Sequence, residues 1–182
     1  MHILRTGGKY ASEQLRLYEV KAIASTLTGA IVLILFSHVW ILSLIFFGLG
    51  LHYLKRRSHW RKGILGEKMV VEALTPLDNS YVLINDVVLP ERTGNIDHIL
   101  VGPNGVFAIE TKSYQWHYLN RFPIRQAIRN AISLRQFLEK QVKIDMFIPA
   151  ILVSTDPDAI SSQSPSTVNV IGLKNLCEFI KG

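Results

Sequence analysis

A long run of uncharged, mostly apolar residues divides the chain into three parts. From Ala22 to Leu54 there is no Asp, Glu, Lys or Arg, which makes 33 consecutive uncharged residues. A basic head (1–21) precedes this run, and the 128 residues that follow it (55–182) mix apolar and polar positions as soluble domains do. The pattern therefore predicts a basic head, an apolar segment and one globular domain.

The apolar run is long for one membrane-spanning helix and short for two. One span needs about 20 residues, a tilted one about 25, and two spans about 40. The centre of the run, Phe36 to Trp40, combines aromatic residues with Ser37 and His38, which is typical of a turn at a membrane interface. A cleaved signal peptide fits badly, because its apolar core has about 7–15 residues. We expect 22–54 to be a retained transmembrane segment, as a helical hairpin or as a single span.

Basic residues flank the apolar run on both sides. Arg5, Lys9, Arg16 and Lys21 precede it, and Lys55, Arg56, Arg57, Arg61 and Lys62 follow it. Because basic flanks stay in the cytoplasm, this distribution favours a hairpin with both ends cytoplasmic. With a single span, the denser cluster would still keep the following domain inside. The expected location is the cell inner membrane, with 55–182 in the cytoplasm.

The globular part alternates between helical and strand periodicities. Apolar residues at helical spacing predict helices over 63–75, 123–143 and 173–181. Apolar or alternating runs predict strands over 81–89, 95–101, 106–112, 146–154 and 168–171, with a loop over 157–166. The Asn104-Gly105 pair between two alternating runs predicts a β-hairpin. The order of elements is typical of an α/β fold with a mixed sheet.

The charge and the cysteine content of the chain say little about its binding partner. The formal net charge is +6, which suits a polyanionic partner, although anionic lipid headgroups explain it equally well. The one cysteine, Cys177, can form no disulfide within the chain, and we expect it to be a small buried residue.

Strand alternation brings three charged residues together. Glu110 and Lys112 stand two positions apart and therefore share a face. A turn at Asn104-Gly105 pairs Pro103 with Val106, so that Lys112 falls opposite Asp97 and Glu110 falls opposite Ile99. All three charged side chains then lie on one face, whereas a slip of one residue would move Asp97 to the other face. His98, next to Asp97, points to that other face and is expected to pack or form hydrogen bonds there.

Two carboxylates and an amine on one face have a clear chemical use. Two carboxylates suffice as protein ligands for Mg²⁺, which keeps several waters. The cation polarises a phosphoryl oxygen and lowers the pKa of a bound water, and a nearby lysine orients that water or balances charge on the phosphate. The same residues are also compatible with a structural ion pair at the end of a sheet.

Four short motifs resemble the nuclease-related domain (NERD) family of the PD-(D/E)XK, or restriction-endonuclease-like, superfamily. In chain order they are Gly66-Glu67, Asp97 within Gly94–Ile99, Glu110-Thr111-Lys112 and Pro123-x-x-Gln126. The resemblance covers roughly 62–155 and implies an α-β-β-β-α-β core. It further implies that Asp97 and Glu110 bind Mg²⁺ or Mn²⁺, that Lys112 positions the attacking water, and that Glu67 and Gln126 assist.

The activity implied by the resemblance is metal-dependent endonucleolytic hydrolysis of DNA by a membrane-anchored cytoplasmic protein. Arg121, Arg125 and Arg129 on the second helix would contact phosphates, or form a solvated face. The segment between Lys112 and Pro123 has only ten residues and is shorter than in the family, which puts substrate engagement in question.

Two alternatives remain open. One is a catalytically inactive, membrane-tethered module that binds nucleic acid or acts as a scaffold. The other is a small membrane-assembly protein whose hairpin drives oligomerisation. A homo-oligomer is compatible with all three readings.

Overall fold

The chain folds into two compact units. The computed structural model describes residues 1–5, 7–36, 38, 40–90, 94–113, 121–155, 162–163 and 168–182. The sheet unit consists of Met1–Gly8 and Leu65–Gly182, and the helical unit is Lys9–Ile64. The hydropathy boundaries at residues 21 and 54 mark changes in composition, whereas the compact units divide at Gly8 and Ile64.

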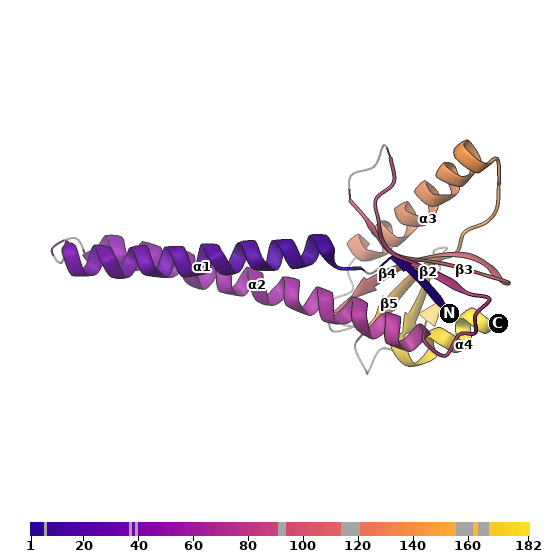
Figure 1. Ribbon diagram of the computed structural model, residues 1–182, viewed down its shortest axis with the longest axis horizontal. Helices are drawn as coiled ribbons and strands as arrows, with labels where there is room; N and C mark the ends of the chain where they lie inside the picture. The colour runs from indigo at the N-terminus through magenta and orange to yellow at the C-terminus, as the bar shows by residue number, and fades with distance from the viewer. Residues whose placement is uncertain are drawn as a thin grey trace. The chain divides into compact units, whose positions relative to one another are not determined.

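The helical unit is a pair of antiparallel helices (Figure 1). It contains α1 (Lys9–Leu35) and most of α2 (Trp40–Leu74), whose last residues belong to the sheet unit. The rings of Tyr18 and Tyr53 lie 6.2 Å apart, and the rings of Tyr10 and Trp60 lie 5.8 Å apart. The start of α1 therefore packs beside the later part of α2.

One helix in the described part of the chain is long and apolar enough to cross a membrane. It is Tyr10–Leu35, judged by length and composition. Trp40 to Leu54 in the other helix supplies 15 uncharged residues before the basic cluster Lys55-Arg56-Arg57.

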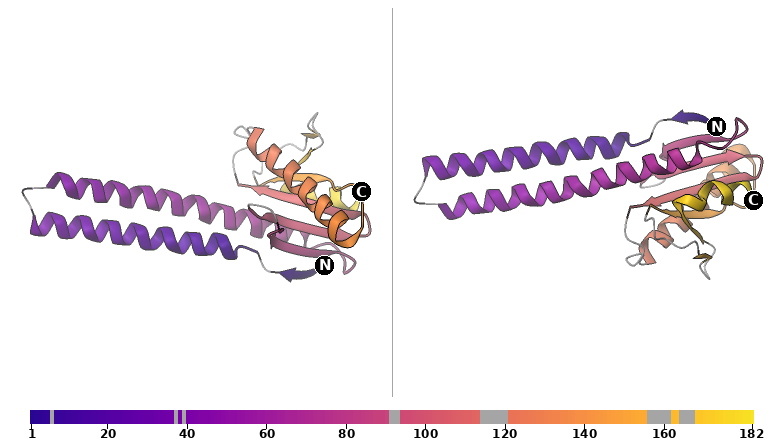
Figure 2. Two further views of the ribbon diagram at one scale, coloured as in Figure 1. Left: turned by 90° about the horizontal axis from the view of Figure 1, so that it is seen from above. Right: turned by 90° about the horizontal axis from the view of Figure 1, so that it is seen from below.

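The sheet unit is built on one mixed seven-stranded sheet in the order β1-β2-β3-β4-β5-β7-β6 (Figure 2). The strands are β1 (His2–Arg5), β2 (Val82–Val87), β3 (Ile96–Gly102), β4 (Gly105–Lys112), β5 (Ala150–Ser154), β6 (Ser162–Gln163) and β7 (Val168–Gly172). The pairs β1/β2, β4/β5 and β5/β7 are parallel, and the other pairs are antiparallel. The helices α3 (Arg121–Val142) and α4 (Leu176–Lys181) complete the unit, with the 3₁₀ turn η3 (Leu173–Asn175) before α4.

The predicted α/β class and the α-β-β-β-α-β order are confirmed, in the order α2, β2, β3, β4, α3, β5. The helix expected over 63–75 is the end of the longer α2, and the strand expected from residue 146 begins at Ala150. The loop expected over 157–166 contains the short strand β6, and its other residues lie outside the described part of the chain. The strand β1 was not predicted.

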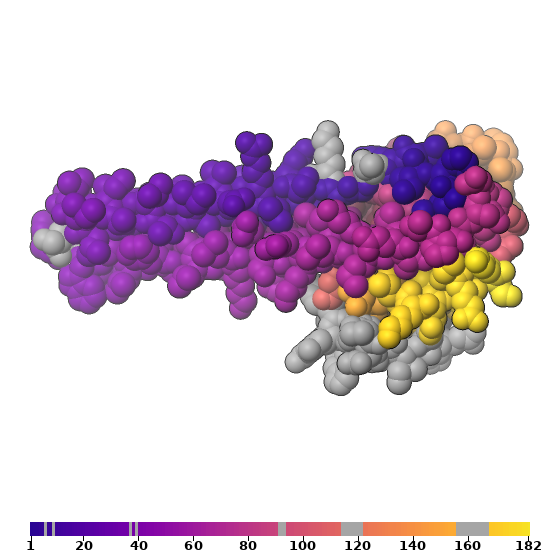
Figure 3. Space-filling model, turned by 60° about the horizontal axis from the view of Figure 1, so that its bottom comes forward, coloured from indigo at the N-terminus to yellow at the C-terminus, as the bar shows by residue number. Residues whose placement is uncertain are grey.

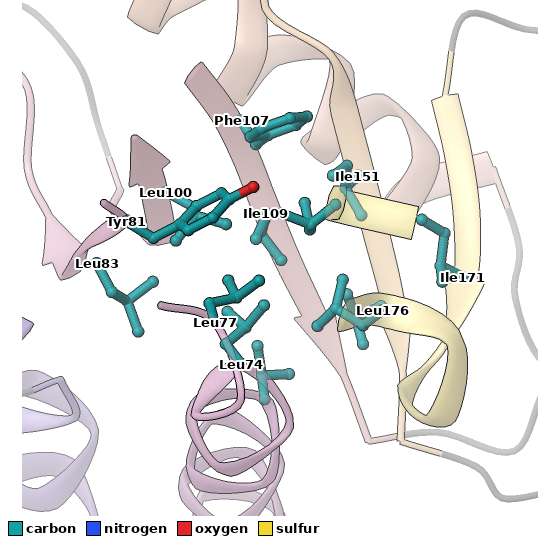
Figure 4. Packing of buried hydrophobic residues seen from close by; sticks show 13 residues of the cluster. Leu74, Leu77, Tyr81, Leu83, Leu100, Phe107, Ile109, Ile151, Ile171 and Leu176 are labelled. Carbon is teal, nitrogen blue, oxygen red and sulfur yellow. The ribbon is translucent and has the colours of Figure 1, made fainter. Parts of the chain in front are cut away.

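Two hydrophobic layers sandwich the sheet. On one face, Val70 and Leu74 of α2 and Leu176 and Ile180 of α4 pack against strand residues such as Ile109 (Figure 4). On the other face, Ala127, Ala131 and Leu134 of α3 pack against Ala108, Ala150 and Leu152. We call these the α2 face and the α3 face. Alternate residues of β4 reach opposite layers, so that Glu110, two positions after Ala108, lies on the α3 face.

Candidate active site

The β3–β4 hairpin places Glu110 opposite Asp97. The paired residues run from Gly102 with Gly105 to His98 with Ile109. The same register, continued by one residue, places Asp97 opposite Glu110. The register predicted from the sequence had Lys112 opposite Asp97, and it is wrong by two residues. The loop is Pro103-Asn104, because Gly105, with φ 126°, already belongs to β4. A shift of two residues preserves the face, so Asp97, Glu110 and Lys112 lie on the same face, as expected.

Two protein groups hold the carboxylate of Glu110. Lys112 Nζ donates to Oε1 across 2.5 Å, and Asn130 Nδ2 on α3 donates to Oε2 across 2.7 Å. Glu110 and Asn130 are both buried. A carboxylate whose two oxygens both accept hydrogen bonds is held in one orientation. The contribution of Asn130 was not predicted from the sequence.

The carboxylate of Asp97 lies beside that of Glu110 in a poorly solvated position. The backbone N–H of Thr111 donates to Asp97 Oδ2 across 2.8 Å. Burial, and then the charge of Glu110, raise the pKa of Asp97 well above its ordinary value, while the Thr111 N–H and Lys112 act against this rise. The carboxyl group of Asp97 therefore holds its proton more readily than an exposed aspartate, and a nearby cation would favour its charged form.

Glu67 joins this group from α2. Burial raises its pKa to about 7, the charges of Asp86 and Glu110 add to the rise, and Lys112 opposes it. Gly66 lets the helix approach the strand ends. A Cβ at Gly66 would collide with Ser113 Oγ and would lie 3.4 Å from the Thr111 methyl carbon.

Asp86 is a further acidic residue, close enough to Glu67 to raise its pKa, and it was not predicted from the sequence. It is buried near the end of β2, and Asn95 Nδ2 donates to its Oδ1 across 2.6 Å. Its φ of 55° lies in the left-handed region, which costs energy for a residue other than glycine. A signal was present, because Asn85-Asp86 is a polar pair inside an otherwise apolar strand.

His98 lies on the α2 face, as its position next to Asp97 indicates. Its Nδ1 lies 2.7 Å from Asn85 Oδ1, and burial lowers its pKa to about 4. The ring is therefore neutral near pH 7. Its Nε2 has no hydrogen-bond partner within the described part of the chain. Asn85 Nδ2 in turn donates to the carbonyl oxygen of Arg5, which adds a side-chain hydrogen bond between β2 and β1.

The remaining residues of the predicted site lie on α3. Gln126 is half-buried one turn before Asn130, but Asn130 is the α3 residue that bonds Glu110. Arg125 and Arg129 are exposed one turn apart. The side chain of Arg121 and residues 114–120 of the short connecting segment lie outside the described part of the chain. A role of these arginines in nucleic-acid binding stays a prediction.

The donor chemistry of the site fits a hard divalent cation held by two carboxylates. Among the described residues, no three His, Cys, Asp or Glu side chains form a cluster able to hold a metal ion. Asp97 and Glu110 nevertheless offer the one or two carboxylates that Mg²⁺ accepts when waters complete its shell. A cation beside them would oppose both causes of the raised pKa of Asp97, which are burial and then the charge of Glu110.

Comparisons with known proteins identify a family for the part of the chain that contains these residues. Residues 62–155 match the family model described as nuclease-related domain. An uncharacterized protein of Bacillus anthracis is 47% identical over 62 residues, which is 31% of this chain and 29% of the relative. The match thus spans less than a third of that relative's length. No solved structure matches the chain.

Proposed function

The chain belongs to the nuclease-related domain (NERD) family, and from this premise we propose that it is a membrane-anchored, cytoplasmic nuclease-like protein that hydrolyses phosphodiester bonds in DNA. The observation that carries the proposal is the pairing of Asp97 with Glu110 across β3 and β4, with Lys112 bonded to Glu110. The proposed enzyme is a Mg²⁺- or Mn²⁺-dependent endonuclease of the PD-(D/E)XK type. Its proposed partners are DNA, or another nucleic acid, and the cell inner membrane.

In this proposal, Asp97 and Glu110 hold the metal ion. The ion, when bound, supplies Lewis-acid activation of the phosphoryl group and a bound water of lowered pKa. Asn130 and Lys112 fix the orientation of the Glu110 carboxylate, which presents it to a ligand without reorganisation. Lys112, whose ammonium group is within hydrogen-bond reach of Glu110, orients the attacking water or balances developing charge on the phosphate.

Glu67 and Gln126 have assisting roles. The pKa of Glu67 is about 7, so this carboxyl group can take up or release a proton near neutral pH. Gln126 stands at the start of α3, one turn before the residue that bonds Glu110. The exposed Arg125 and Arg129 would contact backbone phosphates of the nucleic acid, and Arg121 precedes them in the same series.

A second candidate function is an inactive module that binds nucleic acid or acts as a scaffold at the membrane. The observation that favours it is that both oxygens of Glu110 already have protein partners. Such a carboxylate is satisfied without a cation. The two functions differ in whether a divalent metal binds and whether the backbone of DNA is cut.

Nicking of supercoiled plasmid by the purified full-length chain in detergent tests the proposal. With Mg²⁺ or Mn²⁺ we expect cleavage by the wild type, a loss of about 10²–10³ in rate for Lys112→Ala with metal binding kept, and loss of both cleavage and metal binding for Asp97→Ala. Lys68→Ala, an exposed lysine next to Glu67, is the matched control and should cut like the wild type. Equal nicking by wild type and Lys112→Ala would reject the catalytic role. Absence of nicking with every divalent metal would favour the inactive module.

A further inference from the structure

We infer that the helical unit, Lys9–Ile64, is a membrane hairpin whose two ends lie on the same side of the bilayer, with lipid hydrocarbon covering its outer surface. This decides between the hairpin and the single span that the sequence leaves open. The inference rests on the membrane attachment in the proposed function and is independent of phosphodiester hydrolysis.

The strand β1, before the helical unit, pairs with β2, which follows it. His2 pairs with Val82 and Ile3 with Leu83 in parallel register, and the N–H of His2 donates to the carbonyl oxygen of Tyr81 across 2.9 Å. On its other side β2 pairs with β3, so residues on both sides of the helical unit belong to one continuous sheet. Strands of one sheet cannot lie on opposite sides of a bilayer. The intervening chain must therefore return to the side that it left, and one crossing is excluded.

The helical pair buries small residues and leaves many large apolar residues exposed. Small residues lie between the helices, with Ala22 and Ser43 each 2% exposed and Gly29 and Gly50 also buried. Figure 3 shows the two helices in space-filling form, lying against each other. Large apolar residues are exposed along both helices, and they include Leu27, Ile31, Ile34, Leu35, Ile41, Leu44, Ile45 and Leu51. Only 11% of the most apolar window of α1 is buried. A soluble helical pair buries its large apolar residues, whereas membrane helices approach through small residues and turn the large ones to lipid.

The close approach of the helices depends on two glycines. A Cβ at Gly50 would lie 2.7 Å from Thr26 Oγ1, and a Cβ at Gly29 would lie 3.1 Å from Phe46 Cβ. The hydroxyl groups nearby are satisfied within their own helices, since Thr26 Oγ1 donates to the Ala22 carbonyl oxygen and Ser43 Oγ to that of Trp40. Such internal bonding is what hydrocarbon requires of polar groups.

Charged and aromatic residues lie together at one end of the two uncharged arms. The uncharged arms, Ala22 to Leu35 and Trp40 to Leu54, have 14 and 15 residues and so match in length. At their common base, Lys21 Nζ lies 5.6 Å and 5.9 Å from the ring centres of Tyr18 and Tyr53, and Arg57 forms an ion pair with Glu19. Lysine and tyrosine are typical of a membrane interface. Each arm is about 21–22 Å long, which is short of the ~30 Å hydrocarbon core, so the long basic side chains at the base must extend toward the headgroups.

Labelling of single cysteines in the full-length chain tests the topology. In a Cys177→Ser background, Ser12→Cys and Ser58→Cys mark the two arms and Lys174→Cys marks the sheet unit, all at exposed positions. With a membrane-impermeant maleimide, all three should be protected in spheroplasts and labelled in inverted membrane vesicles. Labelling of Ser12→Cys and Lys174→Cys from opposite sides would overturn the inference. Recovery of the chain in the soluble fraction would overturn both the inference and the membrane attachment, while leaving plasmid nicking untouched.

A pair of glycine variants tests the close contact between the two helices, and links between chains would show whether a second copy lies against them. Gly50→Ile should disrupt the helical pair, whereas Gly48→Ile should not, because a Cβ at Gly48 meets no atom within 4 Å. With cysteines at Glu19 and Arg57, which form an ion pair, a short bifunctional maleimide should link the helices within one chain. For Gly50→Ile we expect a cross-linking rate about tenfold lower, because overpacking at the helix contact separates the two cysteines. Equal rates, or links mainly between two chains, would overturn the inference, and the second result would identify another copy as the occupant.

Discussion

The side-chain amide of Asn130 donates to Glu110 Oε2 across 2.7 Å, and both residues are buried. This bond joins α3 to the strand that carries the Glu-x-Lys motif. It places Asn130 among the groups that position the candidate active site, although no sequence motif marks it.

Asn130→Ala should lower the free energy of unfolding by about 1–3 kcal/mol. The substitution removes a donor and leaves a buried carboxylate oxygen without it. Denaturant unfolding of the full chain in detergent measures the effect, with the exposed neighbour Arg129→Ala as control, expected within about 0.5 kcal/mol of the wild type. If the two variants are equally stable, the bond does not stabilise the fold.

Asp97→Asn should stabilise the fold when metal is absent. Burial and Glu110 raise the pKa of Asp97, so the folded protein loses stability as pH rises above the unfolded value of about 3.9. The gain in unfolding free energy from Asp97→Asn should therefore be absent below about pH 4 and should grow above it. Unfolding midpoints in EDTA measure this. Added Mg²⁺ should stabilise the wild type and not the variant, and the same metal response in both would remove Asp97 from the proposed ligands.

Glu67→Gln should be more stable than the wild type at pH 8 and equal to it at pH 4. The pKa of Glu67 is about 7 in the fold against an ordinary 4.5. The wild type therefore loses stability progressively as pH rises from 4.5 to about 7, and the loss is constant above that. Because the group is partly solvated, we expect on the order of 1 kcal/mol. Glu72→Gln, exposed on the same helix, is the control and should stay within about 0.5 kcal/mol of the wild type.

Gly66→Leu should destabilise the sheet unit by about 1–3 kcal/mol, since the new side chain would enter the space of Thr111 and Ser113. Gly63→Leu, one turn earlier in α2, meets no atom within 4 Å of its Cβ and should be neutral or slightly stabilising. Thermal unfolding of the two variants side by side measures the difference. Equal melting temperatures would show that α2 does not depend on this close approach.

Replacement of residues 9–64 by a flexible linker should yield a soluble sheet unit. The two cut ends are close, because a Cβ at Gly8 would lie 4.0 Å from Glu67 Oε2. The variant should stay in the supernatant after ultracentrifugation and unfold cooperatively. A fragment 55–182 lacks β1 and exposes the edge of β2, so it should be less stable and more prone to aggregate. If both behave alike, β1 contributes little to the sheet unit.

Local periodicity in the sequence was sufficient to predict most elements and the shared face of three charged residues. Glu110 and Lys112 are two positions apart in one strand, and alternation alone dictates that they point the same way. The register of the hairpin was off by two residues, because Gly105 takes its positive φ as the first residue of β4 and not inside the loop. The even shift left Asp97 on the predicted face.

Contacts between distant segments were decided only by the tertiary structure. Asn130 reaches Glu110 from a helix 20 residues later, and β1 pairs with a strand about 80 residues away, although its four residues are all exposed and show no buried face. The backbone of Asp86 adopts a left-handed conformation, which the sequence alone did not predict. The direction of a side chain follows from its own backbone, and so it is readable locally. Which distant residue a side chain contacts depends on how whole helices and strands pack, and no short stretch of sequence determines that packing.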